Sequence, residues 1–338
     1  MIYMCYFWSF LNDKKKKIEM NEAWYDIFME MLYKKYPKKN QLTEALMDLL
    51  CLEREAVYRR LRKDVVFPAS EIMKIATEWH ISLDEITGAA SSKISFSMHP
   101  INYLAPSEED MAFVQKRLKF LKNIEKISYS EFISVSNTVS RSMSAGFPQL
   151  YKFNIFKWAY QYGDGQDNIP YSQIIVPEKL LEEVAIYAQQ MKHLTNTCYI
   201  LDEKIFENVI EEIRFFHSIL LITDEEKELI KQDLYGLLDY LHEIANAGCF
   251  PETKNKVQIY ISMFNLSTNY SYFCYDETEV CRIHTFLLYD NICYNAQMIE
   301  KFKMWMQKKK RTSFKISEVD EKSRIEFYME RRRLIDEL

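Results

Sequence analysis

Apolar residues recur at helical spacing between residues 21 and 86, and this pattern predicts a run of short helices. In one of them Val57 and Leu61 lie four positions apart, so they share one face and are expected to pack inward. The five predicted helices cover residues 21–36, residues 41–50, residues 53–63, a stretch opening at Pro68, and residues 81–86.

The third of these helices is rich in arginine. Arg54, Arg59 and Arg62 lie away from the apolar face that Val57 and Leu61 form. The preceding helix ends only a few residues earlier, with a turn over residues 51–53. This spacing predicts a helix-turn-helix, in which the second helix enters the major groove of DNA and its cations meet phosphates and base edges.

The segment from residue 20 to residue 88 resembles the lambda repressor-like family, that is, the Cro/C1-type or XRE helix-turn-helix domains. The resemblance rests on residues 46–52 as the first motif helix and turn, residues 57–62 in the recognition helix, and residues 81–86 as the closing segment. It implies two groups of DNA-contacting residues. Arg54, Glu55 and Tyr58 would face base edges, and Thr43, Arg59, Arg62 and Lys63 would face phosphates.

Two positions depart from the pattern of that family. Cys51 stands where such domains usually carry glycine, so a left-handed turn at this residue would cost on the order of 1 kcal/mol. Thr43 stands where a phosphate-contacting glutamine is frequent. A basic amphipathic helix can also be a plain solvated face, but the neighbouring helices in the right order favour DNA binding.

The rest of the chain is predicted to be mainly α-helical. Residues 1–19 read as an N-terminal extension, with Met20 as an alternative start, and residues 20–90 as the helix-turn-helix domain. Low periodicity and a His-Pro step predict a linker over residues 91–105. A helical domain over residues 106–250 and a small α+β domain over residues 251–338 complete the expected order.

Within the helical domain, the pattern predicts helices over residues 130–144 and 149–162 and a strongly helical stretch over residues 177–248. Thr223 and Glu226 make a capping box there.

The predicted α+β domain combines strands with two helices. Residues rich in β-branched and aromatic side chains predict an antiparallel meander. Its strands cover residues 257–266, 270–275 and 280–289, and two helices follow over residues 297–310 and 320–338. The charge run in the last helix predicts a solvated face, with a self-association or partner surface as the alternative.

Few residues suggest a metal-binding or catalytic site. The loop at residues 163–170 resembles a calcium loop but lacks the downstream bidentate glutamate, so a plain turn is expected. Cys274, Cys281 and His284 could meet across a hairpin, yet no spacing matches a zinc site. We therefore expect no metal, no cofactor and no enzymatic activity.

Charge and cysteine usage limit the class of protein further. The net charge is −5, which disfavours a protein that coats nucleic acid and favours a regulator with a local basic patch. The seven cysteines show no close pairing and fit a reducing cytoplasm. No stretch is apolar enough to span a bilayer, so no membrane is expected as a partner.

These patterns together predict a cytoplasmic transcriptional regulator that binds double-stranded DNA as a homodimer. The larger C-terminal portion would sense a small-molecule or protein effector, or would dimerise. Two alternatives stay open from the sequence. In one, a helical protein-interaction module uses the helix-turn-helix to dock a partner. In the other, the C-terminal region is a nucleic-acid-processing enzyme.

Overall fold

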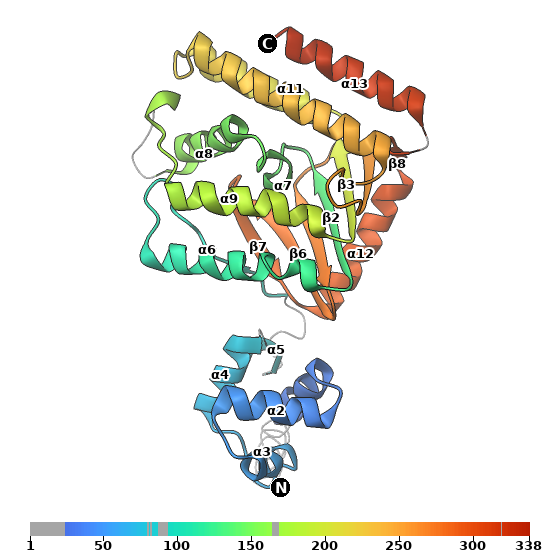
Figure 1. Cartoon of the computed structure of the whole chain (residues 1–338). Coiled ribbons are helices and arrows are strands. Elements are labelled where there is room, and N and C mark those ends of the chain that lie inside the picture. Colours follow the sequence, from blue (N-terminus) through green and yellow to red (C-terminus); the bar gives the residue numbers. More distant parts are fainter. Residues whose placement is uncertain (1–23, 80, 82, 87–93, 164–168, 319) are drawn as a thin grey trace, which may run out of the picture. The chain divides into compact units, whose positions relative to one another are not determined.

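The computed structural model describes residues 24–79, 81, 83–86, 94–163, 169–318 and 320–338. The chain divides into two compact units, Met1–Ser95 and Phe96–Leu338 (Figure 1). The predicted extension over residues 1–19 and the centre of the loop at residues 163–170 lie outside the described residues.

The N-terminal unit is built from short helices around one apolar core. Phe28, Leu46, Val57 and Ile75 are fully buried and come from four different helices, so each helix contributes to one shared core. The helices are residues 24–35, α2 Lys39–Leu50, α3 Arg54–Leu61, α4 Ala69–Trp79 and α5 Leu83–Ile86.

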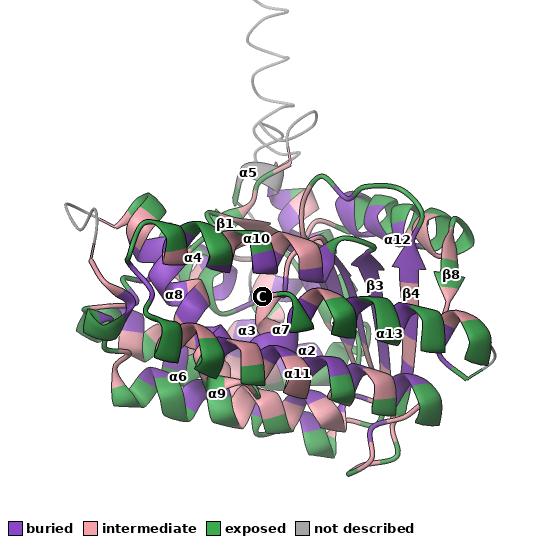
Figure 2. Ribbon diagram, turned by 90° about the horizontal axis from the view of Figure 1, so that it is seen from above, coloured by how far each residue is buried: buried purple, intermediate pink, exposed green. Residues whose placement is uncertain are grey.

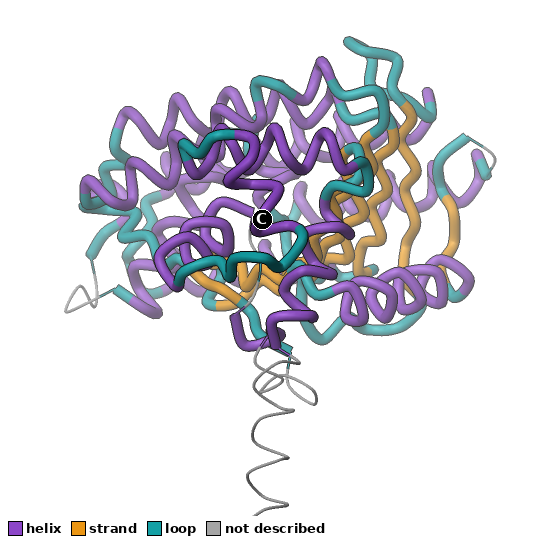
Figure 3. The backbone as a smooth tube through the Cα atoms, turned by 90° about the horizontal axis from the view of Figure 1, so that it is seen from below, coloured by secondary structure: helices purple, strands orange, loops and turns teal. Residues whose placement is uncertain are grey.

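The C-terminal unit is organised around an eight-stranded mixed sheet in the order β1-β7-β6-β5-β2-β3-β4-β8. Strands β2, β3 and β4 are parallel, and β5 pairs antiparallel with β2 and continues into the meander β5-β6-β7. In Figure 3 the strands run side by side next to helices. Their bounds are β1 Ser97–Met98, β2 Ser130–Ser136, β3 Asn196–Asp202, β4 Lys256–Ser262, β5 Tyr270–Tyr275, β6 Thr278–Thr285, β7 Tyr289–Cys293 and β8 Ser313–Lys315.

The helices of this unit follow from clear local signals. Ser107 and Thr223 each form a capping box, with Asp110 and Glu226 respectively, and Gly248 ends α11 at φ 66°. The sequence pattern predicted the second of these boxes. The helices are α6 Glu108–Leu121, α7 Arg141–Ser144, α8 Pro148–Tyr162, α9 Glu178–Gln190, α10 Ile205–Ser218, α11 Asp224–Ala247, α12 Ala296–Arg311 and α13 Glu321–Asp336.

The expectation of a mainly helical protein with a small C-terminal α+β piece is wrong. Residues 130–136 form the strand β2 and not the start of a helix, and β3 interrupts the stretch expected to be helical. Both strands are buried on both faces, as the purple of β3 in Figure 2 illustrates, so they lack the alternation that marks a half-exposed strand. The expected meander is also altered, because β4 pairs with β3 and β8 instead of with β5.

The last helix is not merely solvated. Helix α13 packs against α10 and α11, and Arg324 and Arg331 are buried within its charge run. The Arg331 guanidinium lies 4.4 Å from the ring centre of Phe327 and donates to the Glu203 carbonyl. None of the described helices is long and apolar enough to cross a bilayer.

The side chains of β5 alternate between two faces of the sheet. Tyr270 contacts Phe302 of α12, with ring centres 5.6 Å apart, while Phe273 contacts Phe120 of α6. Since side chains alternate along a strand, Ser271 shares the face of Phe273. We call this face the α6 face of the sheet.

A buried carboxylate joins three helices above the α6 face. The Glu183 side chain on α9 is only 1% exposed, and it accepts a hydrogen bond of 2.6 Å from Arg117 of α6 and another from Arg141 of α7. Burial by itself raises the pKa of Glu183, but the two guanidinium groups lower it below its usual value.

We expect Glu183→Gln to destabilise the protein at neutral pH by about 3 kcal/mol, because two partly buried arginines lose their buried counter-ion. A carboxyl whose folded-state pKa is depressed stabilises the fold above its unfolded pKa of about 4.3, and this contribution disappears as the pH falls through the folded value. The difference in denaturation midpoint between wild type and variant should therefore narrow in acid. Glu182→Gln, at an exposed neighbouring position, is the matched control and should change little. If the difference in denaturation midpoint stayed constant as the pH was lowered, the ionised Glu183 carboxylate would not be the source of the stabilisation.

Candidate nucleic-acid interface

Helix α3 is mounted on the core of the N-terminal unit by Val57 and Leu61, both buried. The same core contains Leu42 and Leu46 of α2, so the two helices share one apolar seam. Residues 51–53 connect them, as the sequence spacing predicted. Because the apolar positions point inward, Arg54, Glu55 and Arg59 of α3 are exposed to solvent.

Thr43 does not belong to this exposed group. It is 1% exposed, and its hydroxyl donates to the Lys39 carbonyl one turn earlier, at 2.8 Å. Its position in α2 thus serves packing. Nothing in the sequence distinguishes it from an exposed threonine except its place beside Leu42 on the apolar stripe.

Arg60 is a structural arginine that sequence reasoning did not single out. Its guanidinium makes two hydrogen bonds of 2.7 Å to the carboxylate of Glu71 on α4 and one of 3.1 Å to the Ala56 carbonyl. It also lies over the ring of Phe67. This bidentate pair fastens α3 to α4, since planar fork-to-fork geometry orients both partners.

Arg62 and Lys63, which directly follow α3, have carboxylate partners. Arg62 pairs with Glu55 and with Asp64, each at 3.0 Å, so its pKa is raised by these two hydrogen bonds. The Lys63 ammonium pairs with Asp26. Glu55, expected to face a base edge, is thus engaged by an arginine of its own helix. Such exposed pairs are weak and can exchange for phosphates.

Arg54, Tyr58 and Arg59 complete the surface. Arg54 is exposed and lies 3.8 Å from Glu44 of α2, and Tyr58 is half-buried with the Lys39 ammonium 5.8 Å from its ring centre. Arg59 is exposed and has no ion-pair partner among the described residues. The sequence therefore named six residues that the fold gathers on and beside α3: Arg54, Glu55, Tyr58, Arg59, Arg62 and Lys63.

The turn before α3 contains a left-handed residue that is not glycine, and this conformation costs free energy. Cys51 ends α2 in the left-handed region, at φ 55° and ψ 46°, and its amide donates to the Met47 carbonyl. A Cβ atom is disfavoured in this conformation, which glycine adopts freely. The strain lies at the residue that sets the angle between α2 and α3.

Two of the residues considered for a metal make other contacts. The His284 Nδ1 atom lies 2.6 Å from Asp290, whereas Cys281 lies opposite Cys293 on the neighbouring strand. In the described part of the chain, no three histidine, cysteine or carboxylate groups are placed to hold a metal ion.

No protein-family model, curated protein or solved structure matches this chain. The resemblance to lambda repressor-like domains therefore rests on the residues of the motif themselves.

We expect Cys51→Gly to stabilise the N-terminal unit by about 0.5–1 kcal/mol, because glycine relieves the left-handed strain. Cys51→Ala is the control: it removes the thiol but keeps Cβ, so it should give no comparable gain. Urea denaturation, followed by the fluorescence of Trp79 and the aromatic side chains around it, measures the free energy of unfolding of both variants. Equal effects of the two substitutions would point to the thiol and away from the backbone.

Proposed function

We propose that this protein is a sequence-specific transcriptional regulator that binds double-stranded DNA through α3. The main support for this proposal is the outer face of α3, where Arg54, Tyr58 and Arg59 lie on a helix that Val57 and Leu61 fix to the core. A rigid short helix with basic residues on its outer face fits the major groove. The Arg60–Glu71 pair supports this role, because recognition requires that the helix be held firmly in place.

In this proposal the residues of α3 have separate tasks. Arg54 and Tyr58, near the start of the helix, read base edges, as the N-terminal residues of recognition helices do. Arg59, Arg62 and Lys63 face phosphates, and the last two must first release Glu55, Asp64 and Asp26. The protein works by binding and not by catalysis, and it acts in the cytoplasm. Its buried free thiols, such as Cys198 and Cys281, support a reducing compartment.

We further propose that the protein binds as a homodimer. Two-fold operators require two recognition helices about 34 Å apart. The C-terminal unit carries exposed apolar side chains that support a self-association surface: Phe264 follows β4, Trp305 lies on α12 and Phe314 lies on the edge strand β8. Exposed apolar surface of this kind can serve as an interaction site.

We expect Arg59→Ala to weaken DNA binding on all sequences and to lower the slope of log affinity against log salt by about 1, because one phosphate contact is lost. Arg54→Ala should instead reduce discrimination at one base pair, by about 1–3 kcal/mol. Fluorescence anisotropy with operator and scrambled duplexes over a salt series separates the two effects. Lys74→Ala, an exposed cation on α4, is the charge-matched control. Identical behaviour of the Arg54 and Arg59 variants would reject the division of roles, and no binding to any duplex would reject the function.

A second prediction concerns the carboxylate that holds Lys63. Asp26→Asn should raise affinity for all duplexes roughly two- to fivefold, because it frees the lysine ammonium for a phosphate. Glu30→Gln is the matched control, since Glu30 is exposed on the same helix and has no ion-pair partner among the described residues. It removes the same charge without releasing a cation. If both variants gain equally, general repulsion and not the Lys63 pair limits affinity.

A further inference from the structure

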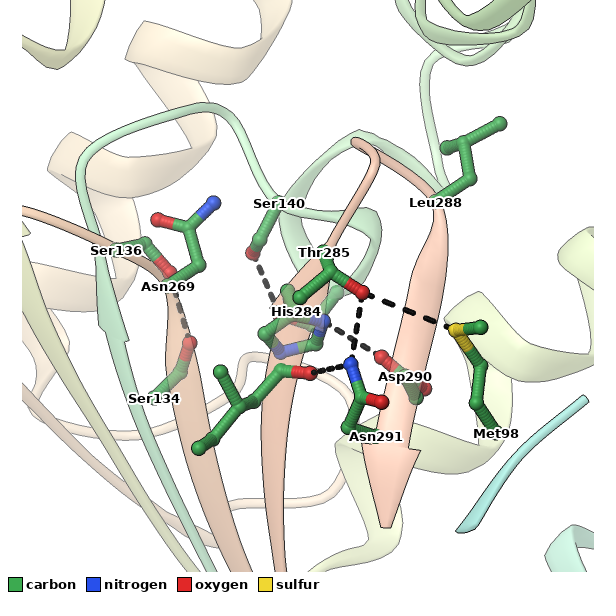
Figure 4. A network of polar contacts seen from close by, with 12 residues as sticks. Met98, Ser134, Ser136, Ser140, Asn269, His284, Thr285, Leu288, Asp290 and Asn291 are labelled. Atoms are coloured by element: carbon green, nitrogen blue, oxygen red, sulfur yellow. Dashed lines mark hydrogen bonds and ion pairs between the residues drawn. The ribbon is translucent and has the colours of Figure 1, made fainter. Parts of the chain in front are cut away.

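Polar side chains replace apolar ones over part of the α6 face of the sheet. Directly paired residues of neighbouring strands point to the same face. Ser134 of β2, Ser271 of β5 and Arg282 of β6 therefore form one row across the sheet, in register with Phe273 two residues further along β5. His284 lies two residues further along β6 and pairs with Asp290 of β7, the strand beside the edge strand β1. Figure 4 shows Ser134, His284 and Asp290 gathered in this region.

Helices add cations and hydroxyls above these rows. Arg117, Arg141 and Glu183 form the ion triad already described, and the Arg141 guanidinium lies 5.2 Å from the ring centre of Tyr187. The fourth element, α8, contributes Tyr151, which is 2% exposed. We call the set of Arg117, Arg141, Arg282, Glu183, His284, Asp290 and Tyr151 the polar cluster.

The charges of the polar cluster act on one another. Burial alone would raise the pKa of Asp290, but His284 and the guanidinium groups of Arg282 and Arg117 lower it below its usual value. Burial raises the pKa of Tyr151, and Arg141 offsets part of that increase. The Tyr151 hydroxyl therefore stays protonated at neutral pH and can donate. Residues from α6, α7, α8, β6 and β7 thus converge on one place.

Positive charge and hydrogen-bond donors exceed their partners in this cluster. Three guanidinium groups face two carboxylates. The Nε atoms of Arg141 and Arg282 and the hydroxyl of Tyr151 are buried and have no partner among the described residues. Buried polar groups in folded proteins are nearly always satisfied, so three unpaired donors in one cluster call for an acceptor that the chain does not supply.

We propose that the polar cluster binds a small organic anion through a phosphate or carboxylate group. The planar guanidinium fork matches both groups, and both offer the acceptor oxygens that the unpaired donors lack. Arg282 is the principal ligand-binding cation, because it is half-buried and no carboxylate of the described residues pairs with it. Tyr151 of α8 donates a second hydrogen bond. Arg117 and Arg141 are held by Glu183 and contribute mainly charge.

Thermal unfolding of the full chain tests the proposal, with inorganic phosphate and citrate as probes and chloride as the reference at constant ionic strength. A ligand that binds only the folded state raises the melting temperature progressively with its concentration. An increase with phosphate alone identifies a phosphorylated ligand, and an increase with citrate alone identifies a carboxylate. The absence of any increase with either probe overturns the proposal. No DNA is present, so this failure would leave the proposed function untouched.

Two variants connect the effect to the cluster. Tyr151→Phe should leave the ligand-free protein as stable as wild type or slightly more stable, because it deletes an unsatisfied hydroxyl. It should weaken anion binding about tenfold, which corresponds to about 1.4 kcal/mol. Arg282→Gln should abolish the increase in melting temperature.

The matched control is Tyr171→Phe. The Tyr171 hydroxyl is satisfied by Gln149 at 2.8 Å, so this variant should lose stability but keep anion binding. Wild-type anion binding by both Tyr151→Phe and Arg282→Gln would show that the probes bind elsewhere and would reject the site.

Discussion

The antiparallel ladder between β2 and β5 holds the C-terminal unit together. It joins the parallel strands β2-β3-β4 to the meander β5-β6-β7, and its register pairs Phe132 with Phe273 and Ser134 with Ser271. The two strands are separated by well over a hundred residues of chain. Every helix that packs on the α6 face depends on this pairing, because a shift by one residue would turn the whole apolar set to the other side.

The same register explains why one sheet carries both a core and a polar cluster. Toward β3 and β4 the α6 face presents Tyr199, Leu201 and Ile259, which are buried and pack with the helices. Toward β6 and β7 it presents Arg282, His284 and Asp290. Such groups do not stabilise an apolar core, since buried polar atoms cost free energy unless they are paired. His284 and Asp290 pair with each other, whereas the buried Nε atom of Arg282 has no partner among the described residues, and the proposed ligand would supply one.

In the N-terminal unit, carboxylates accompany the cations around α3. Asp26 holds Lys63, and Glu55 and Asp64 both hold Arg62, while Glu71 fixes Arg60 inside the unit. Weak exposed pairs of this kind lower affinity for any polyanion but affect contacts to bases less. Under the proposed function, this arrangement and the net charge of −5 would weaken binding that does not depend on the DNA sequence.

The sequence by itself determined the short-range structure. Helix α3 and the turn before it, the capping box of Thr223 and the strand character of residues 270–275 all depend on neighbours within a few positions, where spacing and propensity act directly. It also identified most of the exposed residues on α3. Tertiary structure alone decided the rest. Strands β2 and β3 are buried on both faces, so their composition does not distinguish them from buried helix, and their identity follows from pairing with distant strands. Asp26 meets Lys63, and Ser134 aligns with Arg282, through contacts between residues far apart in the chain, which no local pattern records.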